Sequence, residues 1–181
     1  RWSSASFPQR KKVPSWCNTQ PWQLAVLSAG ETKRLRDKLF DAATALAPMS
    51  PDFGFPERYQ GKYKARRSDC GWQLYDAVGV SKGNRAASER QMRENFRFFG
   101  APHLALVTSP VELGGYGMLD CGAFITGFMV AAQASGLASI AQAALAGYAP
   151  LLRTTLQIPA DCHILCGISF GYRDPAHPTN S

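Results

Sequence analysis

The sequence predicts one domain of the α+β or α/β class, organised around a single long buried helix. Three observations support this prediction: strand-like and helical segments alternate along the chain, one segment is apolar nearly all round, and 45% of the 181 residues are hydrophobic. A chain of this length, folded as one unit, buries about 70% of the surface that it exposes when unfolded. The composition therefore favours a globular protein and excludes the disordered and fibrous classes.

Four segments have the composition of β-strands. Trp22–Ser28, His103–Thr108 and His163–Tyr172 are mainly apolar runs, which predicts strands buried in a sheet. Leu137–Ile140 is shorter and is also strand-like. Gly30 ends the first run and a Gly-Ala-Pro sequence precedes the second, as expected for the punctuation between elements.

Helical spacing appears in the segments between these strands. Three helices are expected over Glu31–Ala47, Asn84–Phe99 and Tyr148–Leu156. In the second of them, Met92, Phe96 and Phe99 are expected to share one face. Prolines at positions 48, 51 and 56 predict a loop, and the basic and aromatic segment 59–75 is either helical or irregular.

The segment Met118–Ser135 is apolar on nearly every side, which predicts a central helix that is buried all round. A glycine-rich turn over Glu112–Gly117 precedes it, and Gly136 ends it. Asp120 is expected in the first turn of this helix, where the helix dipole favours an anion.

The net charge of +7 leaves several classes of partner open. A basic protein binds nucleic acid, an anionic membrane or an anionic cofactor, or it simply has a soluble surface. In the segment 58–67, basic residues are interspersed with aromatic ones, which fits either nucleic-acid binding or a solvated basic face. No uninterrupted apolar run of about 20 residues and no secretory pattern is present, so no membrane partner is expected.

The cysteines and the usual catalytic motifs exclude several chemistries. The five cysteines are irregularly spaced, and only His163 lies near the pair Cys162 and Cys166, so no metal site is expected. The spacing instead indicates reduced thiols in a cytoplasmic protein. Gly115 and Gly117 begin a dinucleotide fingerprint that has an aspartate in the third glycine position, and neither a Walker lysine nor a G-x-S-x-G elbow is present.

Two strings are unusual enough to be candidate binding segments. In Pro14–Trp22, the side chains of Ser15, Asn18 and Gln20 offer hydroxyl and amide groups to the polar edge of a ligand. The alternative is a capped proline loop that leads into a strand. In Gly136–Leu145, small residues would let a ligand approach the backbone, or would let two backbones pack closely together.

Together these strings resemble one family. Four segments carry the resemblance to the FMN-dependent nitroreductases, especially the nitrobenzoate and mycobacterial branch: PSWCNTQPWQL (14–24), NFRFFGAPHLALV (95–107), YGMLDCGAFITGFMVAAQASGLASIAQAAL (116–145) and GISFGYRDPAHPTNS (167–181). The resemblance implies a nitroreductase-like α+β fold, in which a central mixed sheet is flanked by helices around one long buried helix. It also implies a single domain over residues 1–181.

The resemblance further implies a function. Members of this family bind FMN at a homodimer interface, take hydride from NAD(P)H, and pass electrons to nitroaromatics, quinones or similar small aromatic acceptors in ping-pong fashion. Because the flavin carries the redox chemistry, no side chain is expected to act as a catalytic acid, base or nucleophile. NADH and NADPH are equally open as donors.

Matching positions give a set of expected FMN-binding residues. The start of the family's phosphate cradle corresponds to Arg1 and Ser3, and the contacts to the ribityl chain and ring edge correspond to Ser15, Asn18 and the neighbouring Gln20. The backbone that passes the flavin, with an N–H near N5, corresponds to Gln142, Ala143 and Ala144.

The sequence also departs from the family pattern. Ala5 stands where the cradle has its second basic residue, six residues replace a family helix before Pro14, and the sequence given stops before the family's C-terminal arm. These differences keep open a degenerate flavin-binding relative without turnover. The basic segment 58–67 likewise keeps a nucleic-acid binder open as a third hypothesis.

Overall fold

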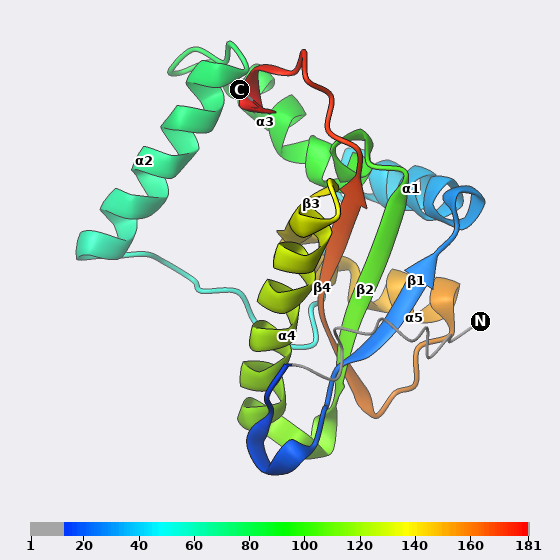
Figure 1. Ribbon diagram of the computed structural model, residues 1–181. Helices are drawn as coiled ribbons and strands as arrows, with labels where there is room; N and C mark the ends of the chain where they lie inside the picture. The colour runs from blue at the N-terminus through cyan, green and yellow to red at the C-terminus, as the bar shows by residue number, and fades with distance from the viewer. Residues whose placement is uncertain (1–12, 181) are drawn as a thin grey trace.

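The structure, a computed structural model, describes residues 13–180. A four-stranded sheet forms its centre, with one long helix against one face and two shorter helices against the other (Figure 1). The strands are β1 (Gln23–Leu27), β2 (His103–Pro110), β3 (Ala138–Gln142) and β4 (Cys162–Gly171). The α-helices are α1 (Ala29–Thr44), α2 (Gly61–Ala77), α3 (Arg85–Arg93), α4 (Gly114–Ala134) and α5 (Ala149–Leu156).

Short 3-10 segments connect these elements: η2 (Trp16–Asn18), η3 (Glu94–Gly100), η4 (Val111–Leu113), η5 (Ala143–Tyr148) and η6 (Pro178–Asn180). Every strand expected from the sequence is present, with bounds that differ by a few residues. The basic and aromatic segment 59–75, for which the sequence allows either a helix or an irregular structure, forms most of helix α2. The predicted α+β class is confirmed.

The sheet has the order β1-β2-β4-β3, so β1 and β3 are its two edges within the described residues. All three pairings are antiparallel, and the expectation of a mixed sheet is therefore wrong for this part of the chain. At the β3 edge, Gln142 pairs with Gly167 and is the last residue in register. Strand β3 therefore ends opposite the middle of β4, and the small residues Ala143 and Ala144 follow it.

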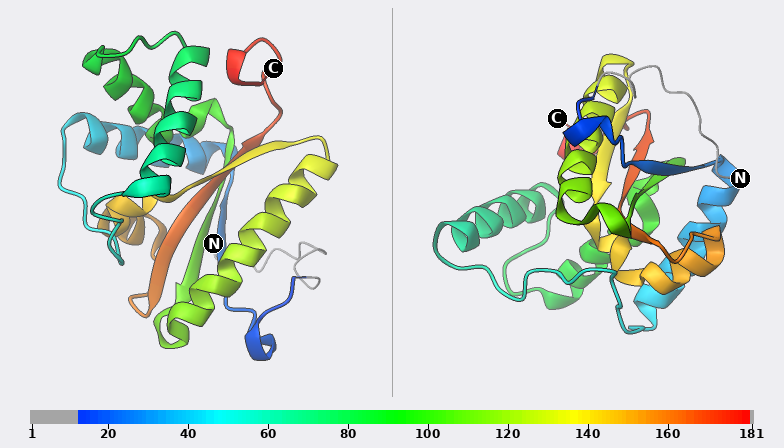
Figure 2. Two further views of the ribbon diagram at one scale, coloured as in Figure 1. Left: turned by 90° about the vertical axis from the view of Figure 1, so that its left-hand side faces the viewer. Right: turned by 90° about the horizontal axis from the view of Figure 1, so that it is seen from below.

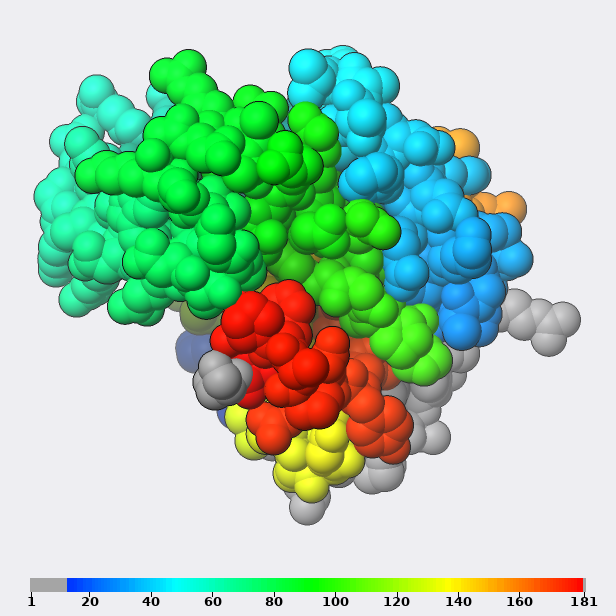
Figure 3. Space-filling model, turned by 90° about the horizontal axis from the view of Figure 1, so that it is seen from above, coloured from blue at the N-terminus to red at the C-terminus, as the bar shows by residue number. Residues whose placement is uncertain are grey.

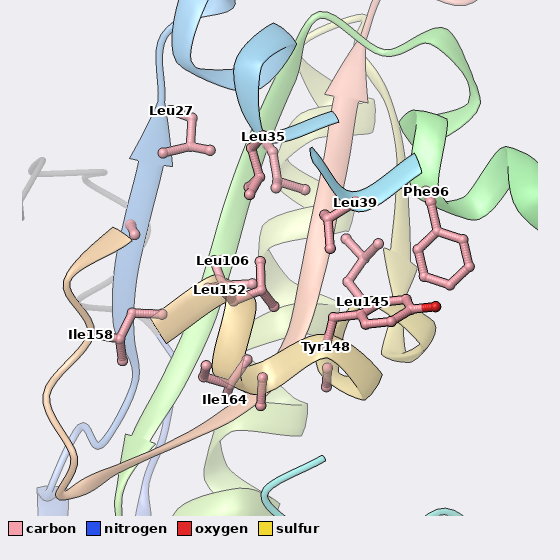
Figure 4. Packing of buried hydrophobic residues seen from close by; sticks show 14 of the residues in the cluster. Leu27, Leu35, Leu39, Phe96, Leu106, Leu145, Tyr148, Leu152, Ile158 and Ile164 are labelled. Atoms are coloured by element: carbon pink, nitrogen blue, oxygen red, sulfur yellow. The ribbon is translucent and has the colours of Figure 1, made fainter. Parts of the chain in front are cut away.

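The sheet separates two hydrophobic clusters. On one face, α1, α5 and η5 cover a large cluster, part of which is shown in Figure 4. On the other face, Cys121 and Phe124 of α4 pack against Trp22, Val107 and Ile168. Trp22 stacks on Phe124 with a ring separation of 5.0 Å. Alternate residues of β2 and β4 point to opposite faces, so continuous apolar runs supply both clusters.

Helix α1 begins with a capping box. The Ser28 side chain accepts a hydrogen bond from the Glu31 amide, and the Glu31 carboxylate accepts one from the Ser28 amide at 2.9 Å. This reciprocal pair satisfies two amides that would otherwise lack acceptors. Leu35 and Leu39 are buried on the inner face, as the helical spacing predicted.

Helix α4 differs from the expected helix in two ways. It begins at Gly114 rather than Met118, so Asp120 lies beyond the first turn, where it is buried. The expectation that the helix is buried all round is wrong, because the sheet covers only one of its sides and Leu119 and Val130 are 67% and 65% exposed. Within residues 13–180, no second layer covers this apolar outer face.

The expected helix 84–99 is also shorter than predicted. Regular α-structure ends at Arg93, and η3 follows with Phe98 and Phe99 at φ values of 58° and 48°. This left-handed turn buries Phe96 and Phe98 but leaves Met92 and Phe99 exposed. The three side chains expected on one face are therefore separated, because the chain turns back towards β2 before the helical period can continue.

Helices α2 and α3 form an arm that extends away from the sheet (Figures 1 and 2). None of the residues of α2 is buried. Seen from above, the last described residues lie between this arm and the start of β3 (Figure 3), and η6 contacts α2.

Among the described residues, the helical stretch Val111–Ala134 is long and apolar enough to cross a membrane by length and composition alone. Because Asp120 lies within this stretch, the sequence has no uninterrupted apolar run of about 20 residues here. Its inner side packs on the sheet, and Asp120 accepts a hydrogen bond from the Trp16 amide. These are the contacts of a helix within a folded domain.

Candidate functional site

The first candidate segment forms a tight polar loop at the end of the sheet where α4 begins. Ser15 Oγ accepts a hydrogen bond from the Gln20 amide at 2.9 Å, and Asn18 Oδ1 accepts one from Gln20 Nε2 at 3.1 Å. Asn18 and Gln20 are exposed. Within residues 13–180, the Ser15 hydroxyl proton and the Asn18 amide nitrogen have no acceptor. Both can therefore donate to a ligand.

The backbone of this loop has an unusual conformation. Cys17, Asn18 and Gln20 have φ values of 50°, 56° and 47°, in the left-handed region that side chains other than glycine seldom adopt. Asp120 holds the loop from below, because its Oδ2 accepts a hydrogen bond from the Trp16 amide at 3.0 Å. A strained loop fixed by a buried carboxylate is typical of a binding segment.

The second candidate segment lies at the β3 edge and is anchored by Gln142. The Gln142 side chain is buried, although the neighbouring Ala143 is exposed and Ala144 is half-buried. Gln142 Nε2 donates to the carbonyl oxygen of Asn95 at 2.9 Å, and the Ser169 hydroxyl donates to Gln142 Oε1. The amide is thus fully engaged with η3 and β4.

After Gln142 the chain leaves the sheet and begins η5. The first amides of a helical segment have no acceptor within it, and the Gln142 side chain makes no cap to them because it bonds elsewhere. Alanine side chains at positions 143 and 144 leave this backbone open to close approach. Of the three residues predicted here, Ala143 is exposed, Ala144 is half-buried and Gln142 is buried, so only the two alanines leave the backbone open.

The two candidate segments are not brought together within one copy of the chain. The first leads into β1 and the second ends β3, and these are opposite edges of the sheet, separated by three interstrand spacings or about 14 Å. Figure 2 shows them on different sides of the molecule. No hydrogen bond joins them among the described residues.

The predicted phosphate-binding residues Arg1 and Ser3 lie outside the described residues. The structure therefore places six of the expected site residues: Ser15, Asn18, Gln20, Gln142, Ala143 and Ala144.

Among residues 13–180, the histidines and cysteines show no arrangement of catalytic side chains. His103 stacks on Phe170 and His163 meets Phe53 edge-on, as packing histidines do. Within the described ranges, no group of three or more His, Cys, Asp or Glu side chains is placed to hold a metal ion. Burial raises the pKa of Cys121 to about 11 and that of Cys166 to about 12, so these thiols are poor nucleophiles.

The basic segment 58–67 begins before α2 and continues into its exposed first turns. Two of its rings are already covered by cations of the same segment. The Arg67 guanidinium lies 5.4 Å from the centre of the Tyr59 ring, and the Lys62 ammonium lies 5.4 Å from that of Tyr63. Both rings thus already make cation–π contacts within the segment. This arrangement favours the interpretation as a solvated basic face.

Three residues with a part in these segments were not predicted as site residues. Asp120 was noted only for the helix dipole, and Asn95 and Ser169 were not singled out. Asp120 interrupts an otherwise apolar helix, which is a signal that sequence reasoning can use. Asn95 and Ser169 do not stand out in the sequence, because polar residues are common in turns and strands. Only the fold shows that both bind Gln142.

With this geometry in view, comparison with known proteins identifies the family. The pattern of the nitroreductase family matches residues 5–172, and the chain belongs to that family. The resemblance expected from the four segments is confirmed.

Two relatives illustrate the similarity. The chain is 35% identical to nitroreductase NfnB of Mycolicibacterium smegmatis over 177 residues, which cover 97% of this chain and 75% of that protein. It is 33% identical to a 4-nitrobenzoate reductase of Nocardioides sp. over 174 residues, which cover 94% of this chain and 70% of that one.

A solved structure agrees in fold. The structure described as the FMN-dependent nitroreductase NfnB from Mycobacterium smegmatis in complex with NADPH superimposes with a TM-score of 0.90 at 34% identity. The match covers 96% of this chain and 78% of that one. The nitroreductase-like fold that the sequence predicts is confirmed.

Proposed function

We propose that this chain is an FMN-dependent oxidoreductase that takes hydride from NAD(P)H and reduces a nitroaromatic or a similar small aromatic acceptor. The main observation that supports this proposal is the structural match to the FMN-dependent nitroreductase in complex with NADPH, which extends over 96% of this chain at a TM-score of 0.90. The curated relatives named above are a nitroreductase and a 4-nitrobenzoate reductase, so the comparisons support the enzyme and not the degenerate alternative.

The described residues fit a flavin. FMN, when bound, supplies the redox chemistry by accepting and donating electrons. Ala143 and Ala144 carry no bulk that would keep a planar ring from the backbone, and their amides would face its edge. Ser15 and Asn18 would donate from the polar loop to the ribityl chain and the polar edge of the ring. Arg1 and Ser3 would hold the phosphate.

The active form is a homodimer. In one copy the two candidate segments lie at opposite edges of the sheet, so a ligand that contacts both needs the first segment of one subunit and the second of its partner. The exposed face of α4 supports this assembly, because Leu119 and Val130 would be buried between two copies. We also propose a cytoplasmic location, which the five free cysteines support.

An absorbance spectrum of the purified protein tests the cofactor. We expect a bound flavin spectrum, which bleaches when NADH or NADPH is added anaerobically and returns when a nitroaromatic is added. Titration with each donor in turn decides the preferred nucleotide. A colourless protein that does not take up FMN would refute the proposal, and bound FMN that neither donor reduces would establish the degenerate alternative.

Light scattering after size exclusion tests the dimer. We expect a dimer for the unchanged chain and a monomer for the double substitution Leu119→Glu and Val130→Glu, because it would bury four charges in one interface. Leu46→Glu is the matched control, since Leu46 is exposed but lies after α1, away from α4. A double variant that remains dimeric would exclude α4 from the interface.

A further inference from the structure

The residue that joins the exposed 143–144 backbone to the sheet is a glutamine whose side chain is turned inwards. Gln142 is 2% exposed, although it stands at a sheet edge between Ala141 and Ala143, which are both exposed. A buried amide is costly unless its donors and acceptor are bonded. The burial of this side chain therefore depends on its partners.

Those partners come from two other elements. Gln142 Nε2 donates to the Asn95 carbonyl oxygen at 2.9 Å and, less closely, to Asn95 Oδ1 at 3.4 Å. The Ser169 hydroxyl of β4 donates to Gln142 Oε1. The amide thereby ties β3 both to its neighbouring strand and to the left-handed turn of η3.

A second anchor lies just beyond the two alanines. Leu145 is fully buried and lies over Gly167, where a Cβ atom would be 2.5 Å from Leu145 Cδ1. Gly167 and Ser169 are two residues apart in β4, so they face the same side of the sheet. The two alanines thus form a short bridge between a polar anchor and an apolar one, both seated on one face of β4.

We infer that Gln142 is a positioning residue: through Asn95 and Ser169 it fixes the Ala143–Ala144 backbone and so sets the ratio of the affinities of the protein for reduced and oxidised FMN. This inference rests on the proposed function. A backbone amide favours whichever form of a ligand carries more negative charge at the atom that it faces, and its preference depends on its position. Loosening the polar anchor should therefore change the balance between the two forms.

The midpoint potential of bound FMN measures this preference directly. For Gln142→Met, which keeps the length of the side chain but removes its amide, we expect the ratio of the affinities for reduced and oxidised FMN to change tenfold. For a two-electron couple this shifts the potential by about 30 mV. We expect the dissociation constant of oxidised FMN to change less than threefold, since the other contacts remain.

Two further variants separate positioning from general instability. Ser169→Ala removes one of the partners and should shift the potential in the same direction by a smaller amount. Thr32→Val is the control: Thr32 is also buried and its hydroxyl donates to the Leu27 carbonyl oxygen, but it lies in α1, away from β3. It should lower stability and leave the potential unchanged.

Hydrogen exchange of the chain without FMN gives a second readout. We expect the amides of residues 143–145 to exchange faster in Ser169→Ala and Gln142→Met than in the unchanged chain. If the unchanged chain binds no FMN, the proposed function fails and the inference fails with it. If it binds FMN and both variants keep its potential, or if Thr32→Val shifts the potential as much as they do, the inference alone is overturned.

Discussion

The ion pair between Asp52 and Arg153 should be a main support of the loop that follows α1. Arg153 Nη2 lies 2.8 Å from Asp52 Oδ2 and 2.9 Å from Oδ1, and Oδ2 also accepts the Ile164 amide of β4 at 2.7 Å. The guanidinium donates as well to the carbonyl oxygens of Pro159 and Cys162. The informative change is Asp52→Ala, which removes the anion that these groups share.

Its magnitude follows from the burial of the pair. Hydrogen bonds to charged groups contribute about 1.5–3 kcal/mol, and breaking a fully buried ion pair costs about 3–5 kcal/mol. The side chains of Arg153 and Asp52 are 26% and 18% exposed, so water replaces part of what is lost. We expect the free energy of unfolding to fall by about 2–3 kcal/mol, which lowers the melting temperature by about 4–12 °C.

The exposed pair Lys33 and Asp37 is a matched control. Its two charged atoms are 2.9 Å apart, nearly the separation of the first pair, but the side chains are 73% and 57% exposed. Pairs of this kind contribute about 0.3–0.5 kcal/mol, so Asp37→Ala should barely change stability. Both variants are compared by urea unfolding followed by circular dichroism.

A double-mutant cycle completes the test. The coupling between Asp52→Ala and Arg153→Ala should be at least about 1 kcal/mol, whereas the cycle on Lys33 and Asp37 should give less than about 0.5 kcal/mol. Equal losses in Asp52→Ala and Asp37→Ala would refute the reasoning, because they would show that burial does not strengthen the first pair.

Three other substitutions or reactions test the packing. Gly167→Ala should lower the free energy of unfolding by about 1–3 kcal/mol in urea unfolding, because the new Cβ would overlap the buried Leu145. Gly117→Ala should cost a similar amount by the same assay, since its Cβ would lie 2.7 Å from Ser109 Oγ and 2.8 Å from Leu113 Cβ. At pH 8, the raised pKa values of about 11 and 12 keep Cys121 and Cys166 protonated, so a thiol reagent should label only the exposed Cys17 and Cys70 quickly and all five cysteines after unfolding. Fast labelling of a third thiol in the folded protein, or losses below about 0.5 kcal/mol in either glycine variant, would contradict these expectations.

Much of the fold was predictable because its signals are local. Glycine, proline and apolar periodicity predicted the four strands. The family was predictable from four segments and is confirmed by its match to residues 5–172. The expected binding role of Ser15, Asn18, Gln20 and the 142–144 segment stays a prediction.

The incorrect predictions concern segments whose local sequence pattern does not show which other elements pack against them. The apolar sides of α4 predicted burial all round, but the sheet covers only one of them in a single copy. The period of segment 84–99 predicted one helix, but two left-handed phenylalanines turn the chain back after Arg93. In both cases the outcome depends on contacts with residues far along the chain.

The sequence by itself determined the element order, the family and the small side chains at 143–144, because these depend on residue type and on neighbours along the chain. Tertiary structure alone decided that Asp120 holds the Trp16 amide, which is 104 residues away, and that Gln142 turns inwards to Asn95 and Ser169. A buried polar side chain is stable only with partners, and those partners are brought to it by folding.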